Sequence, residues 1–127
     1  MADSATARFV VCRVGGRRFA LPVTAVREVC TDVSVVRMPG VAAPVRGVAN
    51  VRGSVVTVVG AAELLRMESE PAQAVVPWLV VLRYRDGRVG LAVDEVVDLT
   101  AIDATVPPIA IDAELDPLFD GAGRTAL

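Results

Sequence analysis

Apolar residues in this chain fall into short runs that glycine, proline and polar pairs interrupt. The first run, Phe9–Val14, is followed by Gly15-Gly16 and then by a second run, Arg18–Leu21. Two such runs around a glycine pair are typical of antiparallel strands joined by a tight turn. Pro22 has no N–H group to donate and ends the ladder. The chain is therefore predicted to open with a β-hairpin.

Two further hairpins are predicted from the same kind of pattern. Valine-rich sequence lies on both sides of Arg52-Gly53, over Val48–Val59, which indicates a strand, a tight turn and a second strand. The runs Trp78–Tyr84 and Val89–Val93 flank Asp86-Gly87, a dipeptide that two-residue hairpin turns favour. We expect both pairs to be antiparallel.

The segments between the hairpins predict a turn, a helix and one more strand. Val23–Val29 has the spacing of a short helical turn that runs into a strand. Ala61–Arg66 is predicted to form a helix of about two turns. Val93–Ile102 mixes apolar and acidic residues and predicts a strand. The tail after Pro107-Pro108 is acidic and rich in turn residues, with few signals of order.

Short strands separated by Gly and Pro turns favour an all-β fold of barrels or a sandwich over an α/β sheet. With 127 residues, the chain fits one compact unit, so residues 1–127 are predicted to form a single domain. Within it, residues 1–7 are predicted to be a flexible N-terminus. Residues 67–77, which carry charge and two prolines, are predicted to be an exposed connection.

Composition narrows the chemistry that the chain can perform. It contains no histidine, and every basic residue is an arginine. This excludes Ser-His-Asp and Cys-His nucleophiles, imidazole metal ligands, Schiff-base lysines and a phosphate-loop lysine. Cys12 and Cys30 lack the spacing of a metal site, and we expect two small apolar residues on strands, without a disulfide. We predict no cofactor and no metal.

Carboxylate chemistry is the one enzymatic class that remains. Asp94, Glu95 and Asp98 are close in sequence and have the chemistry of an acid and base pair or of a hard-cation site. On a strand, however, Asp94 and Asp98 share one face while Glu95 points to the other. A solvated strand edge accounts for this pattern better, so we predict no catalytic residue and keep a carboxylate-dependent enzyme as a rival hypothesis.

Net charge and hydropathy bear on which partners the protein binds and in which compartment it occurs. The net charge is −2 and aromatic residues make up 4% of the chain, which is unlike a surface that binds nucleic acid. The polar N-terminus has no signal peptide pattern, and no apolar run approaches the roughly 20 residues of a membrane helix. We therefore expect a cytoplasmic protein without direct membrane insertion.

Arg52 is the most informative single residue because it is a charge inside an apolar hairpin. Burial of an unpaired guanidinium is very costly, so we expect the side chain to reach solvent or a partner. Arginine is enriched at protein–protein hot spots, since its planar fork combines contact area with directed hydrogen bonds. A plainer alternative is a turn arginine that hydrogen-bonds nearby carbonyl groups. The residue thus favours a contact surface over a chemical pocket.

Three segments together are similar to one known family. Phe19–Val23 and Val26–Val29 resemble its opening pattern of Ala-Leu-Pro followed by Glu-Val. Gly47–Val56 resembles its signature G-V-x-N-x-R-G-x-x-V, and Val89–Val96 resembles its strand V-G-x-x-V-D-x-V. The matches keep the family's order and spacing over about residues 8–120. The chain therefore resembles CheW, the coupling protein of bacterial chemotaxis.

This resemblance implies two small SH3-like five-stranded β-barrels that share a hydrophobic core, with one short helix. It implies a non-catalytic adaptor that couples the cytoplasmic tip of a chemoreceptor (a methyl-accepting chemotaxis protein) to the regulatory domain of the histidine kinase CheA, within receptor arrays at the inner face of the membrane. Family members bind the receptor in a groove between the barrels. Carried over to this chain, that groove comprises Val26, Glu28, Gly47, Arg52, Val96 and Leu99.

The chain also departs from the family pattern. Gly60-Ala61 stands where the family usually has an Asp-Leu pair, so a helix-capping side chain is lost. Leu118–Arg124 resembles the family's penultimate segment, which implies that the final strand and closing helix are lacking. An open barrel edge invites pairing with another chain. The alternative function is therefore a CheW-like module that binds a single partner or associates with itself through that edge.

Overall fold

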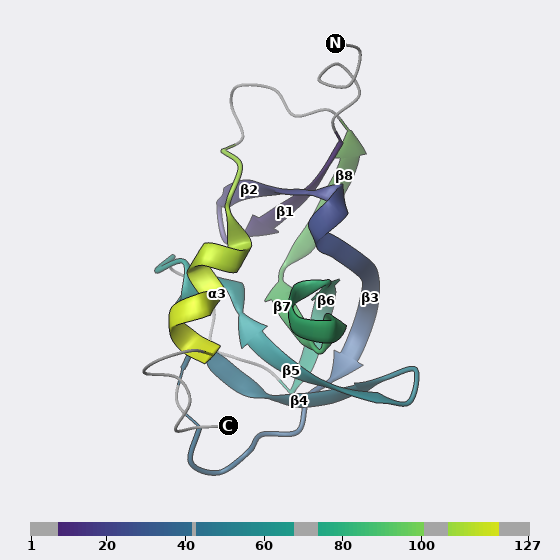
Figure 1. Ribbon diagram of the computed structural model, residues 1–127, viewed down its shortest axis with the longest axis vertical. Coiled ribbons are helices and arrows are strands. Elements are labelled where there is room, and N and C mark those ends of the chain that lie inside the picture. The colour runs from purple at the N-terminus through teal and green to yellow at the C-terminus, as the bar shows by residue number, and fades with distance from the viewer. Residues whose placement is uncertain (1–7, 42, 68–73, 101–106, 120–127) are drawn as a thin grey trace.

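The computed structural model describes residues 8–41, 43–67, 74–100 and 107–119, with backbone only for residues 98–100 (Figure 1). The eight strands in this part of the chain are β1 (Phe9–Val14), β2 (Arg17–Pro22), β3 (Val26–Ser34), β4 (Val45–Val51), β5 (Ser54–Gly60), β6 (Val75–Leu82), β7 (Val89–Val93) and β8 (Glu95–Thr100). The helical elements are η1 (Val23–Ala25), α2 (Ala61–Leu64), η2 (Tyr84–Gly87) and α3 (Ile111–Phe119). The predicted all-β class is confirmed, and so are the three predicted hairpins.

Five strands form one sheet in the order β3-β6-β7-β5-β4. All pairs are antiparallel except β5 and β7, which are parallel. The segment after β3 closes the sheet onto β4, because the N–H of Val36 donates to the carbonyl of Val48 (2.8 Å) and the N–H of Val48 donates back (2.9 Å). The sheet therefore forms the expected five-stranded barrel, seen in the lower part of Figure 1.

The remaining strands form a sheet with the order β2-β1-β8. Residues 107–109 run beside β2, where the N–H of Ala20 donates to the Pro107 carbonyl and the N–H of Ile109 donates to the Ala20 carbonyl. The resemblance implied five strands here as well, whereas the described residues form three strands and this short flanking segment. Residues 120–127, which include most of the segment that resembles the family's penultimate one, lie outside the described residues, as do residues 1–7 and 101–106, so the expected lack of a final strand and helix stays a prediction.

Both sheets contribute side chains to one hydrophobic core. Val10, Phe19 and Leu21 from the three-stranded sheet join Leu82 and Leu91 from the barrel in a single cluster of buried residues. A second cluster fills the barrel itself and includes ten buried side chains, most of them valine. This shared core agrees with the resemblance, and it shows how a valine-rich chain with 4% aromatic residues fills its interior.

Gly47 shows why the barrel closes where it does. Its φ angle is 152°, and a Cβ atom at this position would overlap the backbone carbonyl of Val36. Only a residue without a side chain lets the two strands approach this closely. The glycine of the signature motif therefore has a structural role at the closure of the barrel.

Two helices differ from the sequence prediction. The helix predicted over Ala61–Arg66 spans Ala61–Leu64, and Arg66 with φ 59° lies beyond its end. Gly60 precedes α2 without a side-chain cap, as expected. Helix α3, which covers the core, was not predicted, because its acidic residues and Pro117 resemble a turn-rich tail. Its apolar residues still recur at helical spacing: Ile111, Leu115, Leu118 and Phe119.

Candidate interaction site

Arg52 occupies the tip of the hairpin between β4 and β5. Arg52 and Gly53 have φ angles of 52° and 85°, the left-handed geometry of a two-residue hairpin turn. The side-chain oxygen of Asn50 accepts a hydrogen bond from the N–H of Gly53 at 3.0 Å, which holds the turn in place. The motif residues Asn50, Arg52 and Gly53 thus build the turn itself and place the arginine at its apex.

The guanidinium is paired, yet it remains on the surface. Its Nε–H donates to Oε1 of Glu28 at 2.8 Å, while 81% of the Arg52 side chain and 23% of the Glu28 side chain are exposed. This hydrogen bond raises the pKa of Arg52, so the group is always charged. The alternative of a turn arginine bonded to nearby carbonyls is not what the described residues show, because the acceptor is a carboxylate on another strand.

Cys30 lies beside this ion pair. Its thiol is 3.8 Å from Oε1 of Glu28, and the side chain is half-buried. Burial raises the pKa of the Cys30 thiol, and the neighbouring carboxylate of Glu28 adds to the effect. The thiol is therefore protonated and unreactive near neutral pH. The charged groups at this position are those of Arg52 and Glu28.

The hollow next to the ion pair is too small for a substrate. It has a volume of about 70 Å³, and its lining includes Arg27, Glu28, Arg52, Ser54 and Gly87. Small-molecule sites are usually about 300–1,000 Å³. A shallow depression beside an exposed, oriented charge suits contact with another protein.

The structure brings together two of the six residues assigned to the groove, Glu28 and Arg52. Val26 lies two positions before Glu28 on β3 and is buried in the shared core. Gly47 is buried near the start of β4 against Val36, away from the hairpin tip. Val96 is half-buried on β8 and contacts the shared core, whereas Leu99 pairs with Val10 through its backbone and its side chain lies outside the described residues.

The carboxylates considered for catalysis take part in local contacts. Asp94 accepts a hydrogen bond from the N–H of Gly15 at 2.6 Å, and Glu95 pairs with Nε of Arg13 at 3.1 Å. The two contacts tie the start of β8 and the residue before it to the β1–β2 hairpin. The side chain of Asp98 lies outside the described residues. Among the residues whose side chains are placed, no group of three metal-ligating side chains occurs.

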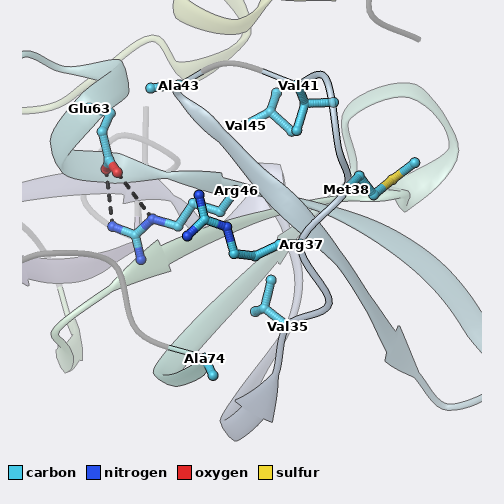
Figure 2. Close-up of a pocket in the computed structure, with 9 residues that line it drawn as sticks. All are labelled: Val35, Arg37, Met38, Val41, Ala43, Val45, Arg46, Glu63 and Ala74. Carbon is cyan, nitrogen blue, oxygen red and sulfur yellow. Dashed lines mark hydrogen bonds and ion pairs between the residues drawn. The ribbon is translucent and has the colours of Figure 1, made fainter.

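A second, larger pocket was not anticipated from the sequence. It has a volume of about 340 Å³ and is lined by valines and by Arg37, Arg46 and Glu63 (Figure 2). Arg46 on β4 and Glu63 on α2 form a two-bond ion pair, with nitrogen–oxygen distances of 3.0 and 3.2 Å. These residues are 17 positions apart, and no local sequence signal links them.

Within the described ranges, no helix has the length and apolar character needed to cross a membrane.

Comparisons with known proteins agree with this fold. A family model described as a CheW-like domain matches residues 8–126. Protein PilI of Pseudomonas aeruginosa is 34% identical over 114 residues, which cover 86% of this chain and 62% of PilI. Chemotaxis protein CheW of Rhizobium meliloti is 36% identical over 110 residues, covering 83% of this chain and 70% of the relative.

A solved structure gives the same picture at lower identity. The scaffolding protein TtCheW of Thermoanaerobacter tengcongensis superimposes with a TM-score of 0.68 and 22% identity, covering 79% of this chain and 68% of that protein. At this identity the likeness concerns the fold. The chain thus spans somewhat less than two thirds of PilI and somewhat more than two thirds of TtCheW.

Proposed function

Because this chain belongs to the family of CheW-like domains, we propose that it is a non-catalytic adaptor that couples a chemoreceptor to the histidine kinase CheA. The adaptor works in the cytoplasm, at receptor arrays on the inner face of the membrane. Two relatives named chemotaxis protein CheW support a chemosensory role, and PilI, with its different name, leaves the choice of receptor and kinase open to a binding experiment.

The exposure of Arg52 in a fixed orientation is the observation that carries this proposal. Its ion pair with Glu28 uses the Nε–H, and the side chain is otherwise exposed at the apex of a two-residue turn that Asn50 stabilises. A guanidinium has further N–H donors on its terminal nitrogens, arranged in a planar fork. A fixed cation with donors to spare is suited to a carboxylate or a carbonyl group on a docking helix.

The full receptor groove is proposed as the six residues assigned from the resemblance: Val26, Glu28, Gly47, Arg52, Val96 and Leu99. Their roles differ in the structure. Arg52 and Glu28 supply the polar contact, and β8 carries Val96 and Leu99 on a strand of the other sheet. The buried Val26 and Gly47 support the strands that carry the contact residues. An amphipathic receptor helix would bind to such a combination of apolar contact surface and charged groups that form directed hydrogen bonds.

Binding of a receptor-tip fragment by the Arg52→Glu variant tests the proposal. We expect the wild-type chain to bind with a dissociation constant in the micromolar range, about −8 kcal/mol. The substitution reverses a charge at the contact and should weaken binding at least about tenfold. Arg17→Glu, a charge reversal at another exposed arginine, on β2, is the matched control. Equal affinity of the Arg52→Glu variant and wild type contradicts the groove assignment.

A parallel titration with the regulatory domain of CheA separates coupling from binding of a single partner. A coupling protein binds both the receptor fragment and the kinase domain. We expect the Arg52→Glu variant to lose affinity for the receptor fragment and to bind the kinase domain like wild type. Binding of only one of the two favours the single-partner module instead.

Self-association is the second candidate, and the edge of β8 favours it. In the described part of the chain, β8 pairs with β1 on one side and with no strand on the other. Unpaired strand edges offer N–H and carbonyl groups to a second chain. Light scattering coupled to size-exclusion chromatography distinguishes a monomer from a self-associated oligomer. A mass that stays monomeric at all protein concentrations would contradict self-association.

A further inference from the structure

The 340 Å³ pocket lies at one end of the five-stranded barrel. The strand register places the ends of β3, β5 and β7 together with the starts of β4 and β6, since Ser34 pairs with Val75 and Val45 pairs with Val59. The lining residues come from this end and from the segment that joins β3 to β4. The mouth of a β-barrel is a common location for a binding site.

This pocket has an apolar floor. Val35 and Val45 have 9% and 7% of their surface exposed, and the half-buried Val41 completes the wall. Met38 at the rim is 41% exposed, and its flexible thioether adapts to different occupants. The volume accommodates one or two aliphatic side chains, so the occupant is a short segment rather than a whole helix.

The polar side of the pocket carries more positive than negative charge. Figure 2 shows Arg37 and Arg46 extending over the same part of the pocket, with Glu63 joined to Arg46. Only 17% of the Arg46 side chain and 30% of the Glu63 side chain are exposed. In the part of the chain that the structure describes, Arg37 has no hydrogen bond or ion pair. Among the described lining residues, one carboxylate therefore accompanies two guanidinium groups.

Gly60 leaves room for this ion pair. A Cβ atom at position 60 would overlap the carboxylate of Glu63 and would lie 2.6 Å from Nε of Arg46. Because the residue has no side chain, the ion pair lies directly over its backbone. The pair thereby holds Arg46 in place and leaves Arg37 as the cation without a counter-charge among the described residues.

We infer that the barrel mouth is a second docking site, which binds an acidic segment of a partner protein. The segment places an aliphatic side chain on the valine floor and the neighbouring carboxylate on Arg37. Charge complementarity selects this occupant, since the described lining of the pocket carries one more positive than negative charge beside an apolar floor. The inference goes beyond the adaptor function and does not rest on it.

This second site is distinct from the Arg52 surface. Arg46 lies near the start of β4 and Arg52 directly follows its end, so the two residues are six positions apart along the strand, or about 20 Å. The pockets at the two positions share no lining residue. One barrel can therefore hold two partner segments at opposite ends.

Titration with short capped peptides tests the inference on the full chain. The probe is acetyl-Ala-Leu-Glu-Ala-amide, compared with a neutral peptide that has Gln in place of Glu and a truncated peptide that has Ala in place of Leu. Methyl resonances of Val35, Val41 and Val45 report binding in carbon-13 NMR spectra. We expect the acidic peptide to shift these methyl signals and to bind about tenfold more tightly than either comparison peptide.

The Arg37→Gln variant makes the test specific. Arg37 is exposed and has no partner among the described residues, so we expect the variant to fold like wild type. We expect it to bind the acidic and the neutral peptide with equal affinity. Arg17→Gln, on the other sheet, should keep the full preference. Equal binding of the acidic and neutral peptides, or an unchanged preference in Arg37→Gln, overturns the inference.

Two further measurements test whether the pocket takes a peptide and whether it acts independently of the Arg52 surface. If 4-methylpentanoate binds as tightly as the acidic peptide, the pocket takes a small free acid and the peptide assignment is wrong. The Arg52→Glu variant should bind the acidic peptide like wild type. Loss of peptide binding in that variant contradicts a separate site, whereas failure of receptor binding alone concerns only the proposed adaptor function.

Discussion

The Nε–H of Arg52 lies 2.8 Å from Oε1 of Glu28, although the two residues are 24 positions apart and belong to different segments of the barrel. The contact ties the tip of the β4–β5 hairpin to β3, while most of the arginine side chain stays in solvent. An exposed ion pair of this kind contributes little to stability. Its main effect is to restrict where the guanidinium points.

Substitution of Glu28 by Gln should change binding more than stability. The amide keeps the size of the side chain and loses the charge that orients Arg52, so the midpoint of thermal unfolding should stay close to wild type. Binding of a receptor-tip fragment should weaken about threefold, less than in Arg52→Glu, because the cation is still present. Calorimetric titration measures the change. A loss as large as that of Arg52→Glu would show that Glu28 itself contacts the partner.

Substitution of Gly47 by Ala should destabilise the barrel by about 2–4 kcal/mol, because the new methyl group overlaps the backbone of Val36 at the closure of the sheet. Urea unfolding followed by circular dichroism measures this free energy. Gly16→Ala is the matched control, since no heavy atom beyond its two chain neighbours lies within 4 Å of its Cβ position. Similar losses in both variants would argue against a special role of the closure.

Helix α3 should contribute substantially to the shared core. Leu115 is fully buried in it, so Leu115→Ala is expected to cost about 2–5 kcal/mol of unfolding free energy. Glu114→Ala, on the exposed side of the same helix, should change stability by less than about 0.5 kcal/mol. Denaturant unfolding of the three proteins gives both values. A cost below about 1 kcal/mol for Leu115→Ala would mean that α3 docks only loosely.

Cys12 should make the protein less stable in alkali. Burial raises the pKa of its thiol from 9.0 to about 12. Above pH 9 the unfolded chain therefore releases a proton that the folded chain retains, so the free energy of unfolding falls as the pH rises from about 9 to 12. Tyr84, whose pKa burial also raises to about 12, acts in the same direction.

The Cys12→Ala variant isolates the thiol. It is less stable near neutral pH because it loses packed volume, but its unfolding free energy should decline less steeply above about pH 9 than that of wild type, with Tyr84 present in both proteins. Urea titrations from about pH 8 to 11 measure the two slopes. Parallel slopes would show that Cys12 ionises normally in the folded chain.

Local sequence was sufficient for the hairpins and for the position of Arg52. Arg52-Gly53 forms the predicted tight turn with two positive φ angles, and valine runs on both sides supply the strands. Asp86 and Gly87 also have positive φ angles, but they lie in a longer connection, residues 83–88, that contains η2, and β6 ends at Leu82 rather than at Tyr84. These features depend on neighbouring residues only, which is why strand and turn patterns identified them. The motif order then identified the family and with it the all-β class.

Helix α3 shows where local reasoning was misled. Pro117 and a run of acidic residues weaken the helical signal, and the helix forms because Ile111 and Leu115 cover the shared core. Tertiary burial outweighs a poor intrinsic propensity in such cases. The spacing of its apolar residues was present in the sequence, but nothing local indicated which surface they would cover.

The sequence by itself thus determined the strands, the turns, the family and the presence of a cation at a hairpin tip. The tertiary structure alone decided that Glu28 orients this cation, that Val36 closes the barrel on Val48, and that Arg46 meets Glu63 over Gly60. The physical reason is the sequence separation over which each interaction acts. Turn and strand preferences act between neighbours, whereas these contacts form only after barrel closure brings distant segments together, and their energy depends on burial and geometry that exist only then.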